Sequence, residues 1–400
     1  MQHTTMVVLT VALLSASLTG DDLAARLEKP HGTVRFASFN VSHHRKHSGD
    51  LAEHLSSGHN RKSQQVAEIL QIVRPDVVLL NEFDFEESRM AAKHFTTLYL
   101  EVSQNGQPPI EYPHTYSASV NTGIDSGLDL NHDGKTGSAA DCYGYGDHPG
   151  QYGMLVLSKY PFDKEHVRTL QKFLWKDMPN ANLPVDPKSK RPYYSKAELD
   201  VFRLSSKSHW DIPIRIRDQT IHFLAAHPTP PVFDGPEDRN GKRNHDEIRL
   251  FADYVDPQRS GYLYDDERQF GGLGRDASFV IAGDYNADPV DGDSSAFAIR
   301  QLTNHPLIDA TMTPTSDGAK EQSQKQGGAN KSHQGNPKHD TADFGDRGRG
   351  SGNLRIDYVL PSKNLRPKNG GVFWPRSDRD EFKLIDASDH RLVWLDVALD

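Results

Sequence analysis

Residues 34–40, with the sequence VRFASFN, alternate apolar and polar side chains, and this pattern predicts a β-strand that ends at Asn40. An amphipathic helix is predicted over residues 66–73, because apolar side chains recur there at helical spacing, and Pro75 stops it. The apolar run at residues 76–80 then predicts a short buried strand that ends at Asn81-Glu82. A strand, a helix and a second strand in this order, with polar residues after each strand, indicate an α/β arrangement in which sites gather at strand ends.

Later segments repeat this arrangement of an apolar strand next to polar side chains. The predicted strands cover residues 154–157, 220–226, 278–282, 354–360 and 392–395. His227 follows the second of these strands, Asp284 and Asn286 follow the third, Asp357 lies inside the fourth, and Asp389-His390 precede the fifth. The chain is therefore expected to have a β-rich scaffold whose strand ends present Asn, Glu, His and Asp side chains.

The composition is that of a globular protein of 400 residues, with 36% hydrophobic and 25% charged side chains. The net charge of -9 argues against a sequence-independent polyanion binder that contacts many phosphates through Lys and Arg. An enzyme that contacts one phosphate through a metal is compatible with this charge. Cys142 is the only cysteine, so no disulfide can form within the chain.

The N-terminus predicts an exported protein. Residues 6–15 form an apolar run of the length of a signal-peptide h-region, and Ser15-Ala16-Ser17 supply small residues for cleavage. We therefore expect a signal peptide at residues 1–20 and a periplasmic or extracellular location. Because residues 1–5 contain no Lys or Arg, an apolar first strand or helix is the alternative. No later segment is long and apolar enough to predict a membrane span.

Five short motifs occur in order along the chain, each at the end or edge of a predicted strand. They are Ser38-Phe39-Asn40, Asn81-Glu82, Gly283-Asp284-Tyr285-Asn286, Arg355-Ile356-Asp357-Tyr358 and Ser388-Asp389-His390. Together with His227, these motifs resemble those of the endonuclease/exonuclease/phosphatase superfamily, which has the fold of deoxyribonuclease I. The resemblance implies an α/β (α+β) four-layer sandwich over residues 32–400, in which two packed mixed β-sheets are flanked by helices.

The resemblance also implies divalent-metal-dependent hydrolysis of phosphate esters, with either a phosphodiester or a phosphomonoester as substrate. Such hydrolysis needs a cation that neutralises developing charge, and an activated water. Mg²⁺, or Mn²⁺ in its place, prefers hard oxygen ligands. Glu82 is the first expected metal ligand, with Asn40 and Asp389 close by.

The resemblance assigns a role to each remaining residue of the set. Asp284 orients or deprotonates the attacking water, and Asn286 holds the phosphate. His390 stabilises the transition state or moves a proton, while Asp357 orients its ring, since a carboxylate behind an imidazole fixes the tautomer. His227 is a second imidazole on the phosphate, as in the family's hydrolases that carry two active-site histidines.

Each of these residues also has a purely structural interpretation. Asn40 could cap the chain after a strand, and Glu82 could be a surface salt-bridge partner, with Asp84 as a rival ligand. Residues 283–289 could be a turn, and His227-Pro228 could be a strand end packed under a loop. Asp357 could pair with Arg355. The occurrence of the whole set in one order favours the catalytic interpretation.

Asp129, Asn131, Asp133 and Gly134 match the first half of a calcium-binding loop, with oxygen ligands at alternate positions. The acidic residue expected at loop position twelve is missing, because Ala140 stands there. Asp125 and Asp141 could complete an irregular site. A structural Ca²⁺ ion in an insertion at residues 121–150 is one expectation, and a hydrated turn is the other.

Two polar segments are expected near the site. Residues 314–352 are rich in Gly, Ser, Gln, Lys, Asn and Asp and almost lack aliphatic residues, which predicts a long, mobile insertion on the strand-end face. Residues 239–247 carry Arg and Lys side chains that could bind a phosphate or a sulfate. The alternative for this second segment is a charged helix start with a solvated face.

Two other functions stay open from the sequence. One is a secreted, non-specific DNA or RNA endonuclease, whose affinity would come from a basic patch that the net charge does not reveal. The other is a catalytically inactive, calcium-stabilised binding domain on the same scaffold, although every expected catalytic position is filled. The sequence implies neither a stable membrane insertion nor a protein partner.

Overall fold

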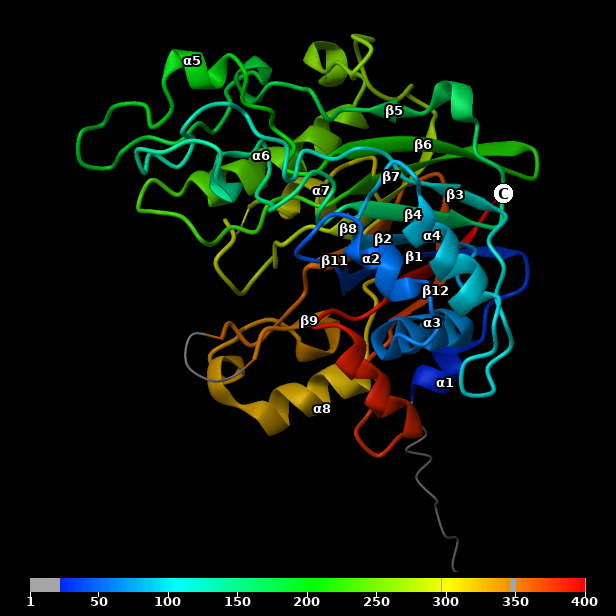
Figure 1. Ribbon diagram of the computed structural model, residues 1–400. Helices are drawn as coiled ribbons and strands as arrows, with labels where there is room; N and C mark the ends of the chain where they lie inside the picture. The colour runs from blue at the N-terminus through cyan, green and yellow to red at the C-terminus, as the bar shows by residue number, and fades with distance from the viewer. Residues whose placement is uncertain (1–21, 296, 346–349, 400) are drawn as a thin grey trace, which may run out of the picture.

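The computed structural model describes residues 22–295, 297–345 and 350–399, so the predicted signal peptide at residues 1–20 lies outside the described residues. Most of the strands belong to two β-sheets (Figure 1). The first sheet contains β1 Thr33–His43, β2 Val77–Phe83, β3 His114–Tyr116, β4 Met154–Ser158, β12 Arg366–Val372 and β13 Val393–Ala398. The second contains β5 Arg168–Thr169, β6 His209–Ile216, β7 Gln219–Ala226, β8 Ser278–Asp284 and β11 Asp357–Pro361. A separate ribbon pairs β9 Ala342–Asp343 with β10 Asn353–Leu354.

The helices are short, apart from two that pack on the outer faces of the sheets. They are α1 Asp22–Leu27, α2 Asp50–Leu55, α3 Arg61–Val73, α4 Met90–Phe95, α5 Lys196–Leu199, α6 Arg239–Tyr254, α7 Arg300–Thr303 and α8 Asp317–Gln326. A π-helix covers Thr96–Leu100, and 3-10 helices cover Ala139–Asp141, Lys164–His166, Trp175–Asp177, Ser260–Tyr262, Gly328–Lys331, Pro337–His339 and Asp380–Ala387. Among the described residues, no helix has the length and apolar character needed to cross a membrane.

Both sheets are mixed. In the first, with strand order β12-β13-β1-β2-β4-β3, only β1 and β2 pair in parallel. In the second, with order β11-β8-β7-β6-β5, only β7 and β8 pair in parallel. The predicted fold class, two packed mixed sheets flanked by helices, is confirmed.

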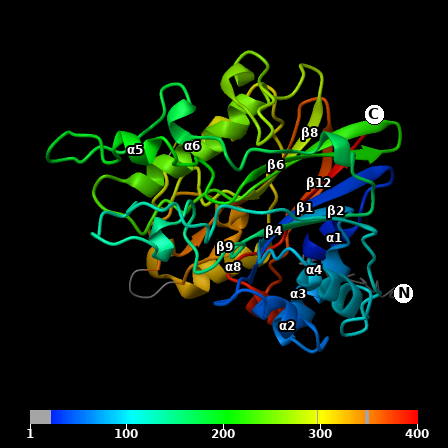
Figure 2. The ribbon, with the colours of Figure 1, turned by 45° about the horizontal axis from the view of Figure 1, so that its top comes forward.

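Alternation of side chains along the strands builds the layers. On β1, Phe36 faces the second sheet, where its ring stacks on Phe223 at a centroid distance of 6.1 Å. Phe39 faces the opposite way and packs with apolar residues of α2 and α3. On the far side of the molecule, α6 and α7 cover the outer face of the second sheet. Figure 2 shows the two sheets between α6 on one side and α2, α3 and α4 on the other.

The same alternation turns the polar side chains at the strand ends toward the space between the sheets. Each of four polar residues lies an even number of positions from an inward-facing core residue, so its side chain faces the same way. The pairs are Asn40 with Phe36, His227 with Ala225, Asp284 with Ala282, and Asp357 with Val359. All four polar residues are buried. The fold therefore gathers these side chains at one end of the sandwich.

The predicted strand at residues 354–360 is wrong in extent. β10 ends at Leu354 and β11 begins at Asp357, and the two strands belong to different sheets. The backbone between them bonds elsewhere, because Arg355 N donates to Asp288 Oδ2 over 2.7 Å and Tyr285 N donates to the Ile356 carbonyl over 2.8 Å. Asp357 therefore opens its strand at the sheet edge instead of lying inside it.

The expected mobile insertion at residues 314–352 is folded throughout the described part of this segment. It forms α8, two 3-10 helices and the β9–β10 ribbon. Ser316 Oγ caps α8 by accepting the Gly318 N–H over 3.0 Å, and it donates to the Trp374 carbonyl over 2.5 Å. Asn330 Oδ1 accepts the Asn353 N–H over 2.7 Å. These hydrogen bonds to the backbone support regular structure where aliphatic residues are scarce, and the mobility of the segment stays a prediction.

The stability of this fold is expected to fall as the pH drops below about 6.5, because two buried histidines are held neutral. Burial lowers the pKa of His43 to about 3 and that of His209 to about 4. Both ring nitrogens of each residue already have hydrogen-bond partners. The unfolded chain takes up these protons below pH 6.5 and the folded chain does not, so each histidine costs about 1.4 kcal/mol per pH unit until its folded-state pKa is reached.

Urea unfolding at pH 7, 6 and 5 measures this effect. His43→Gln and His209→Gln should each reduce the slope of unfolding free energy against pH by about 1.4 kcal/mol per pH unit, which corresponds to the uptake of one proton. His31→Gln, at an exposed position, is the matched control and should leave the slope unchanged. An unaltered slope in the double variant His43→Gln/His209→Gln would show that other groups cause the acid sensitivity.

Candidate active site

Three buried side chains, Asp357, His390 and Asp284, meet between the sheets. His390 Nδ1 lies 3.0 Å from Asp357 Oδ2, and His390 Nε2 lies 3.7 Å from Asp284 Oδ2. Thr341 Oγ1 also donates to Asp357 Oδ2 over 2.8 Å. The alternative partner of Asp357 is engaged elsewhere, because the Arg355 guanidinium lies over the Tyr358 ring at 4.7 Å. Asp357 is therefore placed to orient the imidazole of His390.

Burial and neighbouring charges shift the pKa of His390 and that of Asp284. Burial alone would lower the pKa of His390, but the charges of Asp357 and Asp284 outweigh it and raise this pKa above its ordinary value. Burial also raises the pKa of Asp284 against the opposing charge of His390. The cluster therefore holds a proton on His390 and keeps Asp284 a stronger base than an ordinary carboxylate.

A second imidazole lies on the other side of Asp284. His227 Nε2 is 3.4 Å from Asp284 Oδ2, and His227 Nδ1, which is buried, has no hydrogen-bond partner among the described residues. Burial, reinforced by the charge of Lys207, lowers the pKa of His227 well below its ordinary value. The ring of His227 is therefore neutral, whereas the ring of His390 is protonated.

Asparagine side chains fix the carboxylate of Asp284. Asn40 Nδ2 donates to Asp284 Oδ2 over 3.0 Å, while Asn40 Oδ1 accepts the Ser42 N–H. Asn81 joins the two sheets: its Oδ1 accepts the Asp284 N–H over 3.2 Å and its Nδ2 donates to the Ala226 carbonyl over 3.4 Å. Asn40 is thus more than a strand cap, because it ties the first sheet to the catalytic end of the second.

Asn286 lies in a turn that also belongs to the site. Its N–H donates to Asp284 Oδ1 over 2.9 Å, its side-chain Nδ2 donates to the Pro228 carbonyl over 3.1 Å, and its backbone is left-handed, with φ of 50°. Asn286 therefore lies in a turn and also lines the cavity described below, and its role on a phosphate stays a prediction. The bond to Pro228 joins it to the segment that carries His227.

Glu82 reaches the same region from the first sheet. Its backbone is left-handed, with φ of 56°, and its Oε2 lies 2.9 Å from His44 Nδ1. Burial opposes ionisation, but the hydrogen bond to His44 and the charge of this imidazole lower the pKa of Glu82 to about 2. Asp84, the rival ligand, has a structural role, because its two oxygens accept the N–H groups of Arg45 and Tyr152. Glu82 is therefore the ionised carboxylate that this strand end presents to the site.

The dipeptide Asp389-His390 is divided between two environments. Asp389 is exposed, whereas His390 is buried. Ser388 fixes the dipeptide, because its Oγ donates to the Asn40 carbonyl over 2.7 Å and accepts the His390 N–H over 3.1 Å. The loop before β13 therefore directs His390 to the buried cluster with Asp284 and Asp357 and leaves Asp389 exposed, where its Oδ1 accepts a hydrogen bond from Ser388 Oγ over 3.4 Å.

A cavity of about 850 Å³ opens over this cluster. Six of the predicted residues line it: Glu82, His227, Asp284, Asn286, Asp389 and His390. Asn40 and Asp357 lie behind them, through the contacts given above. The structure thus brings all eight predicted catalytic and metal residues to one site.

The sequence did not predict three residues of the site, namely His44, Lys207 and Thr341. Lys207 is buried and lines the cavity, and among the described residues no acceptor lies within hydrogen-bond or ion-pair distance of its ammonium. Burial lowers the pKa of this group. No signal in the polar stretch around Lys207 could have found it, because that stretch has neither periodicity nor a motif.

The candidate calcium loop has the hydrogen bonds of a turn. Asp129 accepts the N–H groups of Asp133 and Gly134, over 3.1 and 2.8 Å, and Asn131 Oδ1 accepts the Asp133 N–H over 3.1 Å. Asp141 accepts the N–H groups of Leu130 and Ser138. These bonds fit the turn interpretation, and Ca²⁺ binding there stays a prediction.

The segment at residues 239–247 starts α6, and its inner face is buried instead of solvated. Arg243 donates to the carbonyls of Leu204, Arg203 and Tyr143. Glu247 accepts the N–H groups of Ser206 and Thr229, over 2.5 and 2.7 Å. The expected solvated face was wrong, because these side chains anchor the loops that carry Lys207 and His227.

Comparisons with known proteins found a matching family and similar solved structures. The sequence model of the Endonuclease/Exonuclease/phosphatase family matches residues 37–390. No curated protein matches the sequence. The structure is similar to an endonuclease/exonuclease/phosphatase from Beutenbergia cavernae, with 18% identity, a TM-score of 0.49, and 92% of this chain and 72% of that chain covered. It is also similar to sphingomyelinase C from Streptomyces griseocarneus, with 13% identity, a TM-score of 0.45, and coverage of 91% and 99%.

Proposed function

This chain belongs to the endonuclease/exonuclease/phosphatase family, and we propose that it is a divalent-metal-dependent hydrolase of phosphate esters. Members of the family are hydrolases that act on such esters. One observation carries the proposal: the buried carboxylate of Asp284 lies between the imidazoles of His227 and His390, on a cavity that the ionised Glu82 also lines. A general base, a proton donor and a metal ligand therefore share one cavity.

The donor set fits Mg²⁺ or Mn²⁺. Glu82 and Asp389 offer carboxylate oxygens to the cavity, and Asn40 Oδ1 is a third oxygen at the same strand end. Such an ion, when bound, would neutralise charge on the phosphate and lower the pKa of a water. Asp284, Asp357 and His390 are also close enough together to hold an ion. We assign the ion to the Glu82 side, because an ion on His390 Nδ1 would displace its bond to Asp357.

We assign the remaining side chains three roles in hydrolysis: general base, transition-state stabiliser or proton donor, and phosphate binding. Asp284 is the base for the attacking water, since its raised pKa makes it a better proton acceptor near neutral pH. The protonated His390, oriented by Asp357, faces the phosphate and stabilises its developing charge or donates a proton. The neutral His227, the Asn286 amide and the unpaired ammonium of Lys207 surround the same space and hold the non-bridging oxygens.

Metal removal tests this proposal. EDTA is expected to abolish hydrolysis, and Mg²⁺ or Mn²⁺ should restore it, because Asp284 and His390 alone leave the negative charge of the phosphate uncompensated. The measurement is a substrate panel of a phosphomonoester, a chromogenic phosphodiester, plasmid DNA, RNA and a phospholipid, each with Mg²⁺, Ca²⁺ or EDTA.

The panel is run in parallel with two variants. His390→Ala should lower the rate on the best substrate about 1,000-fold, whereas His31→Gln, at an exposed site, should match the unmodified protein. Turnover that survives both EDTA and His390→Ala would disprove the assignment of the site. Failure of every substrate with every metal would count against hydrolase activity itself.

A further inference from the structure

Beyond its phosphate end, the cavity has aromatic walls. Tyr145 and Phe233 line it with 63% and 86% of their surfaces exposed, respectively. Phe344 also lines it, and its ring lies edge-on to His390 at a centroid distance of 5.7 Å. Exposed aromatic side chains that gather on one cavity, unlike those scattered singly, mark a place where a ligand or a partner binds. These three rings thus offer apolar surface within reach of the proposed phosphate site.

Phe233 is held in its exposed position by the start of α6. Its backbone is left-handed, with φ of 67°, a conformation that is costly for a bulky side chain. Asn240 fixes both neighbours of Phe233: its Nδ2 donates to the Val232 carbonyl over 2.7 Å, and its N–H donates to Asp234 Oδ2 over 2.6 Å. The ring is therefore presented at the cavity mouth by a constrained loop.

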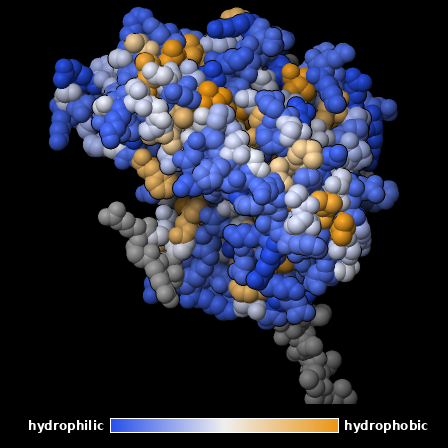
Figure 3. Space-filling view, viewed as in Figure 1, coloured by the Kyte–Doolittle hydropathy of each residue, from blue (hydrophilic) through white to orange (hydrophobic). Residues whose placement is uncertain are grey.

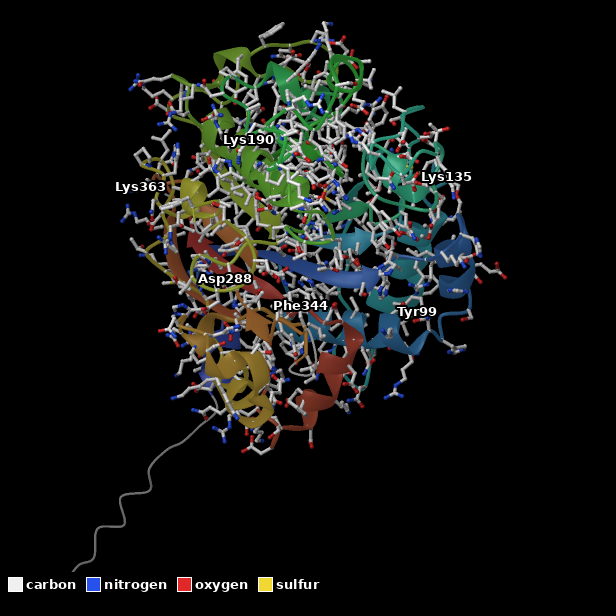
Figure 4. The ribbon with its side chains drawn as sticks, turned by 90° about the vertical axis from the view of Figure 1, so that its left-hand side faces the viewer. Tyr99, Lys135, Lys190, Asp288, Phe344 and Lys363 are labelled. Carbon is white, nitrogen blue, oxygen red and sulfur yellow. The ribbon has the colours of Figure 1, made fainter. Side chains whose placement is uncertain are left out.

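The charges around the cavity are suited to a single phosphate. Of the three Lys and Arg side chains among the described lining residues, Arg239 is paired with Glu237 and Arg243 binds backbone carbonyls, which leaves Lys207 beside the catalytic cluster. Besides Glu82 and Asp389, which we assign to the metal, the carboxylates of Asp288, Asp291 and Asp293 line the cavity. In Figure 4, Asp288 and Phe344 lie near the middle of the face turned to the viewer, whereas Lys135, Lys190 and Lys363 lie farther out. A second phosphate of the same substrate would meet negative charge.

The size of the cavity limits the ligand further. Its volume of about 850 Å³ lies within the usual range for small-molecule sites, which is about 300–1,000 Å³. Its lining includes residues from the part of the chain that carries α5 and α6 and from the segment after α8, together with others at residues 82, 130–152, 284–294 and 389–390. On the face shown in Figure 3, apolar side chains gather along the notch at the left edge, between these two parts.

We propose that the site takes a small ester with one phosphate and a compact aromatic group, and that this group packs against Tyr145, Phe233 and Phe344. This inference rests on the proposed hydrolase function for the placement of the phosphate. A nucleic acid strand is disfavoured as the substrate, because its neighbouring phosphates would meet the carboxylates of Asp288, Asp291 and Asp293.

Calorimetric binding of two phosphonates in the presence of Mg²⁺ tests the inference without turnover. Phenylphosphonate is expected to bind about 30-fold more tightly than methylphosphonate, since only the phenyl ring reaches the aromatic walls. Phe233→Asn removes the ring at a position whose left-handed backbone Asn tolerates, and Tyr145→Ala removes a second ring. Each variant should reduce the affinity ratio about fivefold or more.

Phe270→Ala is the matched control, because Phe270 is an exposed aromatic residue outside the cavity lining and its loss should leave the ratio unchanged. An oligothymidylate of eight nucleotides should bind more weakly than phenylphosphonate. Equal affinities for the two phosphonates, or tighter binding of the oligothymidylate, would overturn the inference. Failure of the substrate panel would instead overturn the hydrolase function, since the phosphonate comparison does not depend on turnover.

Discussion

Replacing Asp284 with Asn is expected to lower kcat about 1,000-fold or more while the protein stays folded. The substitution keeps the shape of the side chain but removes the carboxylate that lies beside both imidazoles and accepts the Asn40 amide. Burial raises the pKa of Asp284, which means that the folded protein carries this charge at a cost. The neutral variant should therefore be at least as stable as the unmodified protein, and only the chemistry should be lost.

Steady-state kinetics on the best substrate of the panel and urea unfolding measure the two effects. Asp246→Asn is the matched control, because Asp246 is a buried carboxylate of α6 that accepts Trp175 Nε1 and the Asn182 N–H away from the cavity. Asn keeps an oxygen acceptor there, so activity should persist. If Asp284→Asn retained more than about a tenth of kcat, Asp284 would not be the base, because a lost base costs at least about 100-fold.

The strand-end residues were accessible to sequence reasoning for a physical reason. A strand has a period of two, so an apolar pattern that fixes the inner face also fixes the face of the polar residue that ends the strand. Asp284 and His227 each continue the inward parity of their strands, through Ala282 and Ala225. Sequence order alone could therefore predict that these side chains meet, once both sheets were assumed to pack face to face.

Glu82 shows where this periodicity stops being informative. Leu80, two residues earlier on β2, packs with the helices on the outer side of the sheet, so simple alternation would turn Glu82 away from the site. The left-handed backbone at Glu82 interrupts the alternation, and His44 then fixes the carboxylate over the cavity. A positive φ at a Glu residue has no local sequence signal, and only the resemblance to a family placed Glu82 in the site.

Lys207 and Thr341 were missed for a related reason. Both lie outside the regular strands, and their positions depend on long-range hydrogen bonds. Glu247 of α6 accepts the Ser206 N–H next to Lys207, and Thr341 N donates to the Leu354 carbonyl. Low aliphatic content suggested that residues around Thr341 would not fold by themselves, and indeed they are ordered by polar contacts with the rest of the chain.

Replacing Asp396 with Ala is expected to destabilise the fold by about 3–5 kcal/mol, because it would leave a buried guanidinium without its counter-ion. Asp396 and Arg35 are 0% and 1% exposed, and they form a two-pronged pair with Nε–Oδ1 and Nη2–Oδ2 distances of 2.7 Å. Arg35 Nη1 also donates to the carbonyls of Val73 and Leu27. The pair therefore ties β1 to β13, α3 and α1, and urea unfolding of the variant measures its loss.

Two further variants separate the lost pair from the lost packing. Arg35→Met/Asp396→Leu removes both charges and fills the space, and it should recover most of the stability, since a buried ion pair can be replaced by apolar side chains at little net cost. Asp200→Ala breaks exposed ion pairs with Lys176 and Lys196 and should cost far less stability than Asp396→Ala. If Asp396→Ala cost no more than Asp200→Ala, water or a neighbouring carbonyl would be compensating Arg35, and the pair would contribute little to holding β1 against β13.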